Sequence, residues 1–161
     1  MSEWTKDSLD NFYRSSEVYR TFNTPFVLDT IGVIESIIRG AVKTSLVRLD
    51  KLLTWQDGWD GYDASAPDPD AVAYAKQWIC QMFIAATDVA RTWIDPNLTG
   101  GSEGEVVFEW WSGKKKLTIY VTADSVEYVR VWGLNIDTEM ADGSAVPFGT
   151  CQALWLWLTA E

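Results

Sequence analysis

The chain has 161 residues, the length of one ordinary domain, and 47% of them are hydrophobic, which excludes disorder on a large scale. It carries 13 Lys and Arg against 23 Asp and Glu, a net charge of −10, and this balance disfavours direct binding to nucleic acid or to anionic membranes. We therefore expect one folded domain and a protein partner with a basic surface, although an acidic surface also serves solubility alone.

The residue inventory limits the chemistry and the compartment. The chain has no histidine, and its two cysteines, Cys80 and Cys151, stand far apart, so no zinc signature and no usual Ser or Cys triad can be assembled. We expect no cofactor, no metal and no enzymatic activity. The start of the chain lacks the basic and apolar segments of a signal peptide, which together with the cysteine count predicts a cytoplasmic protein.

The first predicted elements are helical. Residues 1–24 are polar with scattered aromatic residues and are interpreted as an arm or short helix preceding a single α+β domain over 25–161. From Pro25 to Trp55 apolar residues recur every three or four positions, which predicts one long helix. Gly32 and Gly40 lie inside it, so either a break or a close helix crossing is expected near one of them.

A second long helix is predicted from Pro69 to Ile94. Asp68 is placed to cap it, Pro69 fits the first helical position, and Asp70 adds a negative charge where the helix dipole favours one. Pro96 disfavours helical geometry at the residue before it, so the residues that follow are expected to form a loop.

Strand patterns follow, because the hydrophobic period changes from 3.6 to 2. Alternation over 105–111, 116–122 and 128–132 predicts a three-stranded antiparallel meander, and 134–140 could add an edge strand before a turn at 141–143. Residues 151–158 fit both periods, and a short helix after Gly149 is favoured over a strand. The fold class is thus α+β, with two long helices packed on a three- to four-stranded antiparallel meander and a short C-terminal helix.

The predicted sheet has one aliphatic face and one aromatic, charged face. The aliphatic face, which includes Val129 and Val131, is expected to pack against the helices. The other face is either covered as a second core or exposed for binding, since Tyr and Trp are enriched in binding hot spots. The candidate binding residues on it are Glu109, Trp111, Tyr120, Tyr128, Arg130 and Trp132.

Carboxylates offer the main enzymatic alternative. A pair drawn from Asp57, Asp60 and Asp63 with Glu105 and Glu109, set beside tryptophans, could hydrolyse a glycosidic bond. The spacing of the three aspartates differs from that of an EF-hand, and Asp in a Gly-rich turn usually caps backbone amides. A structural motif is therefore expected there, formed by Gly58, Trp59, Asp60, Gly61 and Tyr62.

Two segments carry a resemblance. The run from Gly58 to Pro67, with the sequence GWDGYDASAP, and the later run from Gly104 to Trp110, GEVVFEW, resemble a widespread group of small uncharacterised bacterial proteins. Those proteins show a GWDGYGA-x-P segment, a helix and a G-[EG]-[IV]-x-L-E-W strand. The likeness covers about residues 45–132, with Asp63 where glycine is common, and it implies a bacterial or phage origin and a shared fold without assigning an activity.

The leading functional hypothesis is a non-catalytic protein-binding module. It would act as an antitoxin, an immunity protein or an inhibitor of a bacterial defence nuclease by occupying a basic surface on its partner. One alternative is a carbohydrate-binding or glycoside-hydrolysing protein that uses Trp and paired carboxylates. A second is an inhibitor that mimics DNA, and a homodimer is also left open.

Overall fold

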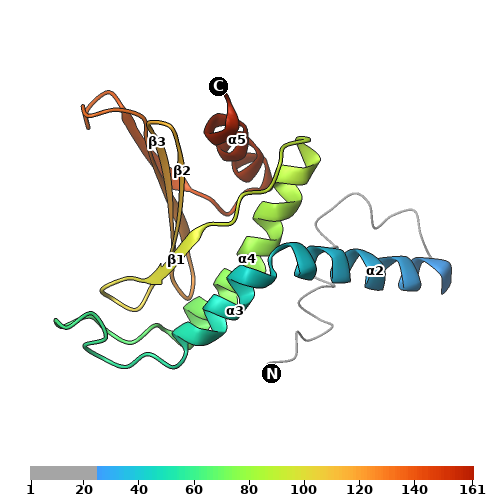
Figure 1. The fold of residues 1–161 in the computed structure, drawn as a ribbon, viewed down its shortest axis with the longest axis horizontal. Coiled ribbons are helices and arrows are strands. Elements are labelled where there is room, and N and C mark those ends of the chain that lie inside the picture. The colour runs from blue at the N-terminus through green and yellow to red at the C-terminus, as the bar shows by residue number, and fades with distance from the viewer. Residues whose placement is uncertain (1–24) are drawn as a thin grey trace. The chain divides into compact units, whose positions relative to one another are not determined.

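The structure is a computed structural model that describes the backbone of residues 25–161 and the side chains from residue 31 onward (Figure 1). The predicted N-terminal arm over residues 1–24 lies outside this range. The described part is an α+β fold, as expected. Its elements are the helices α2 to α5 and an antiparallel sheet of five strands, β1 to β5.

The first helical stretch is not one long helix, which corrects the prediction. Helix α2 spans Pro25–Ala41 and helix α3 spans Lys43–Leu52. Between them Val42 has φ −103° and ψ 13°, outside helical geometry, and its side chain is fully buried. The break lies two positions after Gly40, a residue of low helix propensity. The sequence predicts either a break or a close helix crossing near one of the two glycines, and the structure has a break.

Helix α4 spans Pro69–Asp88 and begins as predicted. The Asp68 carboxylate accepts a hydrogen bond from the backbone N–H of Asp70, and Pro69 occupies the first turn. The helix ends before the predicted Ile94 because Ala90 takes a left-handed conformation with φ 54°. The N–H of Ala90 bonds to the carbonyl of Thr87, and that of Arg91 to Ala86, which is a Schellman motif with Ala in the position usually held by Gly.

The sheet has five strands, whereas the sequence predicts a meander of three or four. Its strands lie in the order β1-β2-β3-β4-β5, and every neighbouring pair is antiparallel. The three predicted strands are β2 (Val106–Ser112), β3 (Lys115–Val121) and β4 (Val126–Val131). The edges are β1 (Asn97–Gly100), which was expected to be loop, and β5 (Met140–Ser144), which occupies the predicted turn in place of 134–140.

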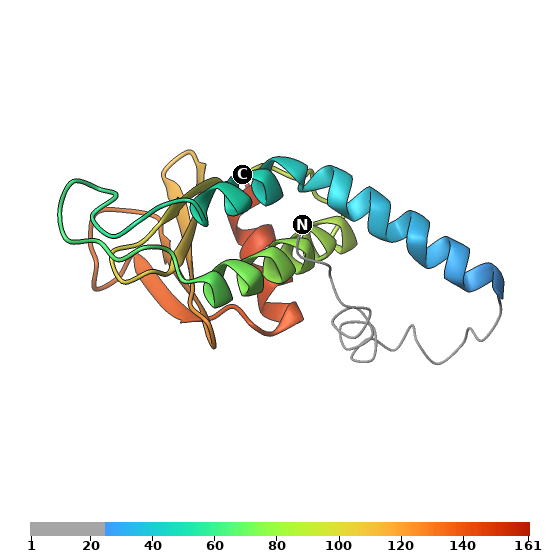
Figure 2. The same cartoon turned by 90° about the horizontal axis from the view of Figure 1, so that it is seen from below.

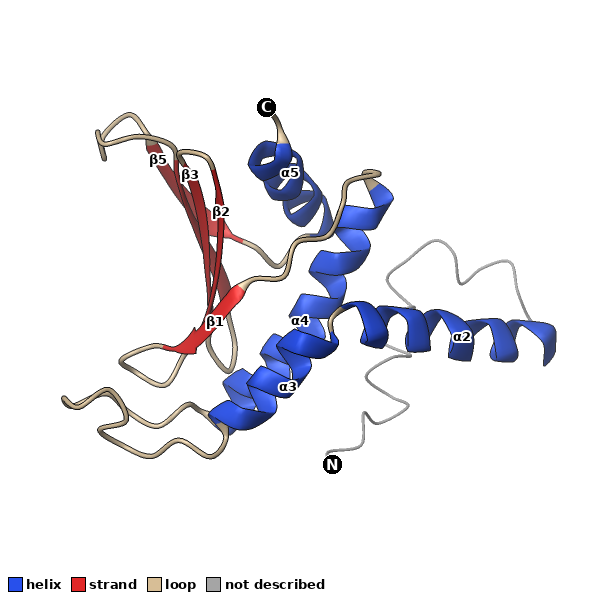
Figure 3. Ribbon diagram, in the orientation of Figure 1, coloured by secondary structure: helices blue, strands red, loops and turns tan. Residues whose placement is uncertain are grey.

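The helices α4 and α5 cover one face of this sheet, here called the inner face (Figure 3). Helix α5 spans Phe148–Thr159 and confirms the C-terminal helix. Helix α4 contacts both α3 and α5, and the turned view shows α5 crossing behind α4 (Figure 2). Helix α3 packs on α4 and on β1. In the described residues no helix covers the opposite face, here called the outer face (Figure 3).

The core between the helices and the inner face is aromatic. Trp78 of α4, Trp110 of β2 and Trp155 of α5 are each at most 2% exposed. The rings of Trp93 and Trp155 stack with centroids 5.0 Å apart, and Trp110 meets Trp155 edge-on at 5.8 Å. The indole N–H of Trp78 donates to the carbonyl of Ala145 and that of Trp110 to the carbonyl of Ile94, whereas the buried indole nitrogen of Trp155 has no hydrogen-bond acceptor. Trp78, Trp110 and Trp155 are therefore core residues.

Candidate functional site

The outer face is arranged in rows, because residues directly opposite each other in neighbouring strands share a face. The row nearest the β2–β3 and β4–β5 turns runs from Trp111 through Lys116 and Val131 to Met140. The next two rows lie progressively further from these turns. Their members are Asn97, Glu109, Thr118, Val129 and Asp142, and then Thr99, Val107, Tyr120, Glu127 and Ser144.

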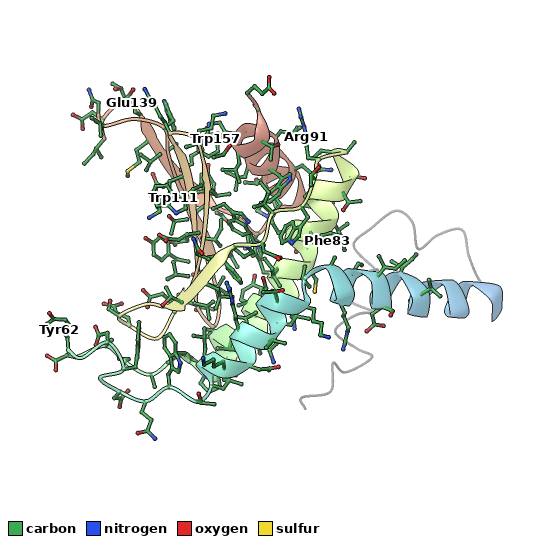
Figure 4. All side chains as sticks on the ribbon, viewed as in Figure 1. Tyr62, Phe83, Arg91, Trp111, Glu139 and Trp157 are labelled. Carbon is green, nitrogen blue, oxygen red and sulfur yellow. The ribbon has the colours of Figure 1, made fainter. Side chains whose placement is uncertain are left out.

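Trp111 is held in place on this face. Its side chain is 56% exposed, and Lys116 Nζ lies 4.6 Å from the centroid of its ring. The same Nζ lies 2.5 Å from Glu109 Oε1. One lysine therefore bridges a carboxylate and an indole, a combination that restricts the rotamers of all three side chains. Figure 4 shows Trp111 on the side of the sheet away from the helices.

The middle of the outer face is apolar and shielded by its neighbours. Val107 is 8% exposed and Thr118 is 5% exposed, and Val129 and Val131 are half-buried. Tyr120 and Met140 stand at opposite ends of the face and are each more than a third exposed. The face thus has a low centre of valine and threonine side chains, with the larger side chains of Trp111, Tyr120 and Met140 at its margins.

The sequence-based assignment of strand β4 to the faces is wrong. Val121 pairs with Val126 across the β3–β4 turn, so Val126 lies on the inner face and is buried. Tyr128 and Arg130 follow at period 2 and therefore lie on the inner face with Ile119 and Leu117, their cross-strand partners. Valines 129 and 131 lie on the outer face. The physical reason is the turn: its length sets the register, which decides the face more strongly than side-chain polarity.

The three misplaced residues line the margin of the inner face. Tyr128 lies across Gly143 of β5, where an added Cβ would stand 3.0 Å from the ring. The guanidinium carbon of Arg130 lies 5.6 Å from the ring centroid of Trp132 and 5.4 Å from that of Trp157 on α5. Arg130 Nε is buried without a hydrogen-bond acceptor. These side chains close the end of the core, so they are separated from Trp111 and Tyr120 by the sheet.

The predicted motif after α3 forms a hydrogen-bonded loop. Asp60 Oδ1 accepts bonds from the backbone N–H groups of Tyr62 and Ala64, and Asp57 Oδ1 accepts one from Ala66. Gly58 and Gly61 have positive φ of 76° and 82°. At the base of the loop, the ring of Trp59 lies 4.5 Å from that of Trp55, and its indole N–H donates to the carbonyl of Ser65. Tyr62 at the tip is 83% exposed (Figure 4).

Four of the five candidate catalytic carboxylates, all except Asp63, have partners in the fold. Asp57 and Asp60 bond to backbone amides, Glu109 pairs with Lys116, and Glu105 accepts a bond from the backbone N–H of Glu103. Over residues 25–161 no group of three or more acidic or cysteine side chains is placed to hold a metal ion. The geometry thus gives these four acids roles in the fold.

A cavity of about 240 Å³ lies where the outer face meets the start of α4. Three acidic residues, Asp68, Glu103 and Glu105, line it together with Tyr120 of the outer face. The segment that leads into α4 meets the segment that leads into β2 at this cavity, because the N–H of Asp68 donates a hydrogen bond to the carbonyl of Gly104. The cavity therefore extends the outer face toward a strongly acidic end of the domain.

Both cysteines are buried. Burial raises the pKa of the Cys151 thiol to about 11, against smaller lowering contributions from hydrogen bonds with Gln81 and Trp78. A thiol with such a pKa is protonated at neutral pH and is a poor nucleophile. Cys151 is a core residue that donates to the carbonyl of Ala145.

Sequence reasoning placed Glu109, Trp111 and Tyr120 together on the outer face, and the structure brings these three together. It missed Val107, Thr118, Val129, Val131 and Met140, which complete the face. The available signal was the length of the turn between β3 and β4: the residues 122–125 bring Val126 directly opposite Val121, so the two share a face, and this pairing gives the face of every residue of β4.

Comparison of the chain with protein-family models, with curated proteins and with solved structures gave no match. In the described part of the chain, no helix combines the length and the apolar character that crossing a bilayer requires. The function is therefore argued from the geometry of the outer face.

Proposed function

We propose that this protein is a non-catalytic binding module whose outer face docks on a basic surface of another protein. The observation that carries the proposal is the uncovered face itself, with Trp111 56% exposed and fixed by Lys116 beside an apolar centre. A sheet normally buries each apolar face against another layer. Among the helices that the structure describes, α4 and α5 supply that layer on the inner face alone, so a partner would supply it on the outer face.

Charge favours a basic partner. The outer face carries Glu109, Glu127 and Asp142 against one cation, Lys116, which already pairs with Glu109. Beyond Tyr120 the cavity adds further carboxylates, and no Lys or Arg occurs between Lys51 and Lys76. The acidic residues of that stretch are Asp57, Asp60, Asp63, Asp68 and Asp70. Such a field steers a basic protein to the face and raises its association rate.

The partner class that best suits this charge is a protein that itself binds nucleic acid. Its basic cleft would meet the acidic end of the outer face, so the module would act as an inhibitor, antitoxin or immunity protein. Nucleic acid and the module would then compete for one surface. The proposal places the protein in the cytoplasm, where it needs neither a metal nor a cofactor.

Affinity purification from the native host tests the proposal. The wild-type chain and the variant Trp111→Ser/Met140→Ser are immobilised in parallel, with Tyr62→Ser as the matched control because Tyr62 is an exposed aromatic residue away from the outer face. We expect proteins retained by wild type and by Tyr62→Ser at about 150 mM salt to be lost by the double variant. Added DNA should displace them.

Two outcomes would contradict the proposal. Retention of the same proteins by all three baits would show that binding does not use the outer face. Retention of no protein by wild type, with glycan-array binding that disappears in Trp111→Ser, would instead indicate a carbohydrate-binding protein. Equal unfolding midpoints of the three baits would establish that the comparison concerns binding and not folding.

A further inference from the structure

The loop between β4 and β5, residues 132–139, is ordered by its own polar groups. Glu139 Oε2 accepts a hydrogen bond from the N–H of Asn135, and the carbonyl of Asn135 accepts bonds from Thr138 and Glu139. The N–H of Trp132 donates to the carbonyl of Glu139 and closes the loop. The Glu139 carboxyl lies against Gly133, where any side chain would collide with it. Glu139 thus organises the loop from inside (Figure 4).

This ordered loop presents two aliphatic side chains to solvent. Leu134 is 101% exposed and Ile136 is 72% exposed. No other leucine, isoleucine or valine side chain that the structure describes is as exposed. Neither side chain contributes to the hydrogen bonds that shape the loop. A polar residue at either position would satisfy the loop equally well, so the fold does not account for the hydrophobic choice.

The loop is continuous with the outer face. It joins Val131 to Met140, which are cross-strand partners in the row that begins at Trp111. Met140 is 38% exposed at the foot of the loop. A partner seated on this row would therefore reach Leu134 and Ile136 as well, and the exposed aliphatic and aromatic side chains would form one apolar end of the interface.

We infer that Leu134 and Ile136 are the apolar anchors of this interface and insert into an apolar pocket on the partner protein. The inference rests on the proposed function and deepens it, because it gives the surface two chemically different ends. The partner would offer an apolar pocket opposite the β4–β5 loop and basic residues opposite Tyr120 and its cavity. An anionic bilayer is the less suitable occupant, because the loop carries Asp137 and Glu139 and the chain has a net charge of −10.

Site-specific crosslinking followed by reconstitution tests the inference. The photoreactive residue p-benzoyl-L-phenylalanine is placed at position 134 of the full chain in native host cells, and at position 47 as a control, since Val47 is 58% exposed on α3. We expect a protein crosslinked from position 134 and not from position 47. That protein is then identified, purified and titrated calorimetrically with wild type, with Leu134→Ser/Ile136→Ser and with the control Val47→Ser/Leu53→Ser.

The expected result is a loss of affinity of about a hundredfold or more in Leu134→Ser/Ile136→Ser, since two aliphatic side chains lose their burial, and about twofold or less in the control. Crosslinking to lipid, to a second copy of the chain, or to nothing would overturn the inference, as would wild-type affinity in the loop variant. If Trp111→Ser weakens binding while the loop variant does not, this inference fails and the proposed function stands. If neither variant weakens binding, both fail.

Discussion

Replacing Gly104 by alanine should disturb the junction between the sheet and the segment that leads into α4. Gly104 has a φ of +91°, a conformation that residues with a Cβ rarely adopt. An added Cβ would stand 2.9 Å from the carbonyl oxygen of Ala66 and 3.5 Å from the backbone nitrogen of Asp68. The carbonyl of Gly104 also accepts the hydrogen bond from Asp68, at 2.8 Å, which fixes the start of α4 beside the sheet.

The magnitude follows from two separable effects. The left-handed backbone costs a non-glycine residue about 1–2 kcal/mol. The conflict with a backbone oxygen, which cannot rotate away as a side chain can, adds about 1–3 kcal/mol. Gly113 supplies the matched control, because it has a φ of +58° and no atom within 4 Å of an added Cβ. We expect Gly104→Ala to lose about 2–5 kcal/mol of unfolding free energy and Gly113→Ala about 1–2 kcal/mol.

Urea unfolding followed by tryptophan fluorescence measures both variants. The difference between them isolates the steric effect, since the backbone conformation is left-handed at both positions. Equal losses at the two positions would refute the steric argument. A changed slope of unfolding free energy against urea in one variant would show an altered denatured or native state, and that variant would then be compared by thermal unfolding.

The remaining predictions concern the helix end, the buried thiol and the loop. Ala90→Gly should raise the unfolding free energy by about 0.5–1 kcal/mol in urea, because the position is left-handed; a loss would contradict the Schellman assignment. Between pH about 9 and 11 the unfolded thiol of Cys151 loses its proton while the folded thiol keeps it. Stability should therefore fall by about 1.4 kcal/mol per pH unit more in wild type than in Cys151→Ala, and parallel pH profiles would rule this out. Asp60→Ala removes the acceptor for Tyr62 and Ala64 and should cost about 1 kcal/mol in the same urea assay, whereas an unchanged midpoint would mean that the loop holds without it.

The elements that could be predicted from the sequence are those in which local pattern and tertiary contacts agree. The start of α4 has its cap, proline and acidic first turn in adjacent positions, and all three act as expected. Strands β2 and β3 alternate strictly, with Phe108 and Ile119 on the inner face, and the structure pairs them as predicted. In both cases the residues that determine the element lie within it.

The elements that the sequence did not reveal depend on neighbours remote in the chain. Strand β1 contains Asn97 and Gly100, which disfavour strands, and it forms because β2 offers an edge to pair with. Strand β5 contains Asp142 and Gly143, typical of a turn, yet Gly143 is required because the ring of Tyr128 occupies the place of a side chain. A single sequence gives no measure of such pairing.

Only part of the candidate site could be predicted from the sequence, because the face on which a residue lies depends on how its strand pairs with its neighbours. Tryptophan count alone suggested an aromatic binding face, but most indoles in residues 25–161 belong to the core or its margins, and Trp111 is the exposed one. What distinguishes Trp111 from Trp110 beside it is parity: adjacent residues of one strand face opposite sides of the sheet. The turn between β3 and β4 pairs Val121 with Val126 and so reverses this parity, which puts Arg130 and Trp132 on the inner side and Val129 and Val131 on the outer face. The residues that this sheet exposes are therefore set by register first, and side-chain chemistry matters only among the residues that the register leaves exposed.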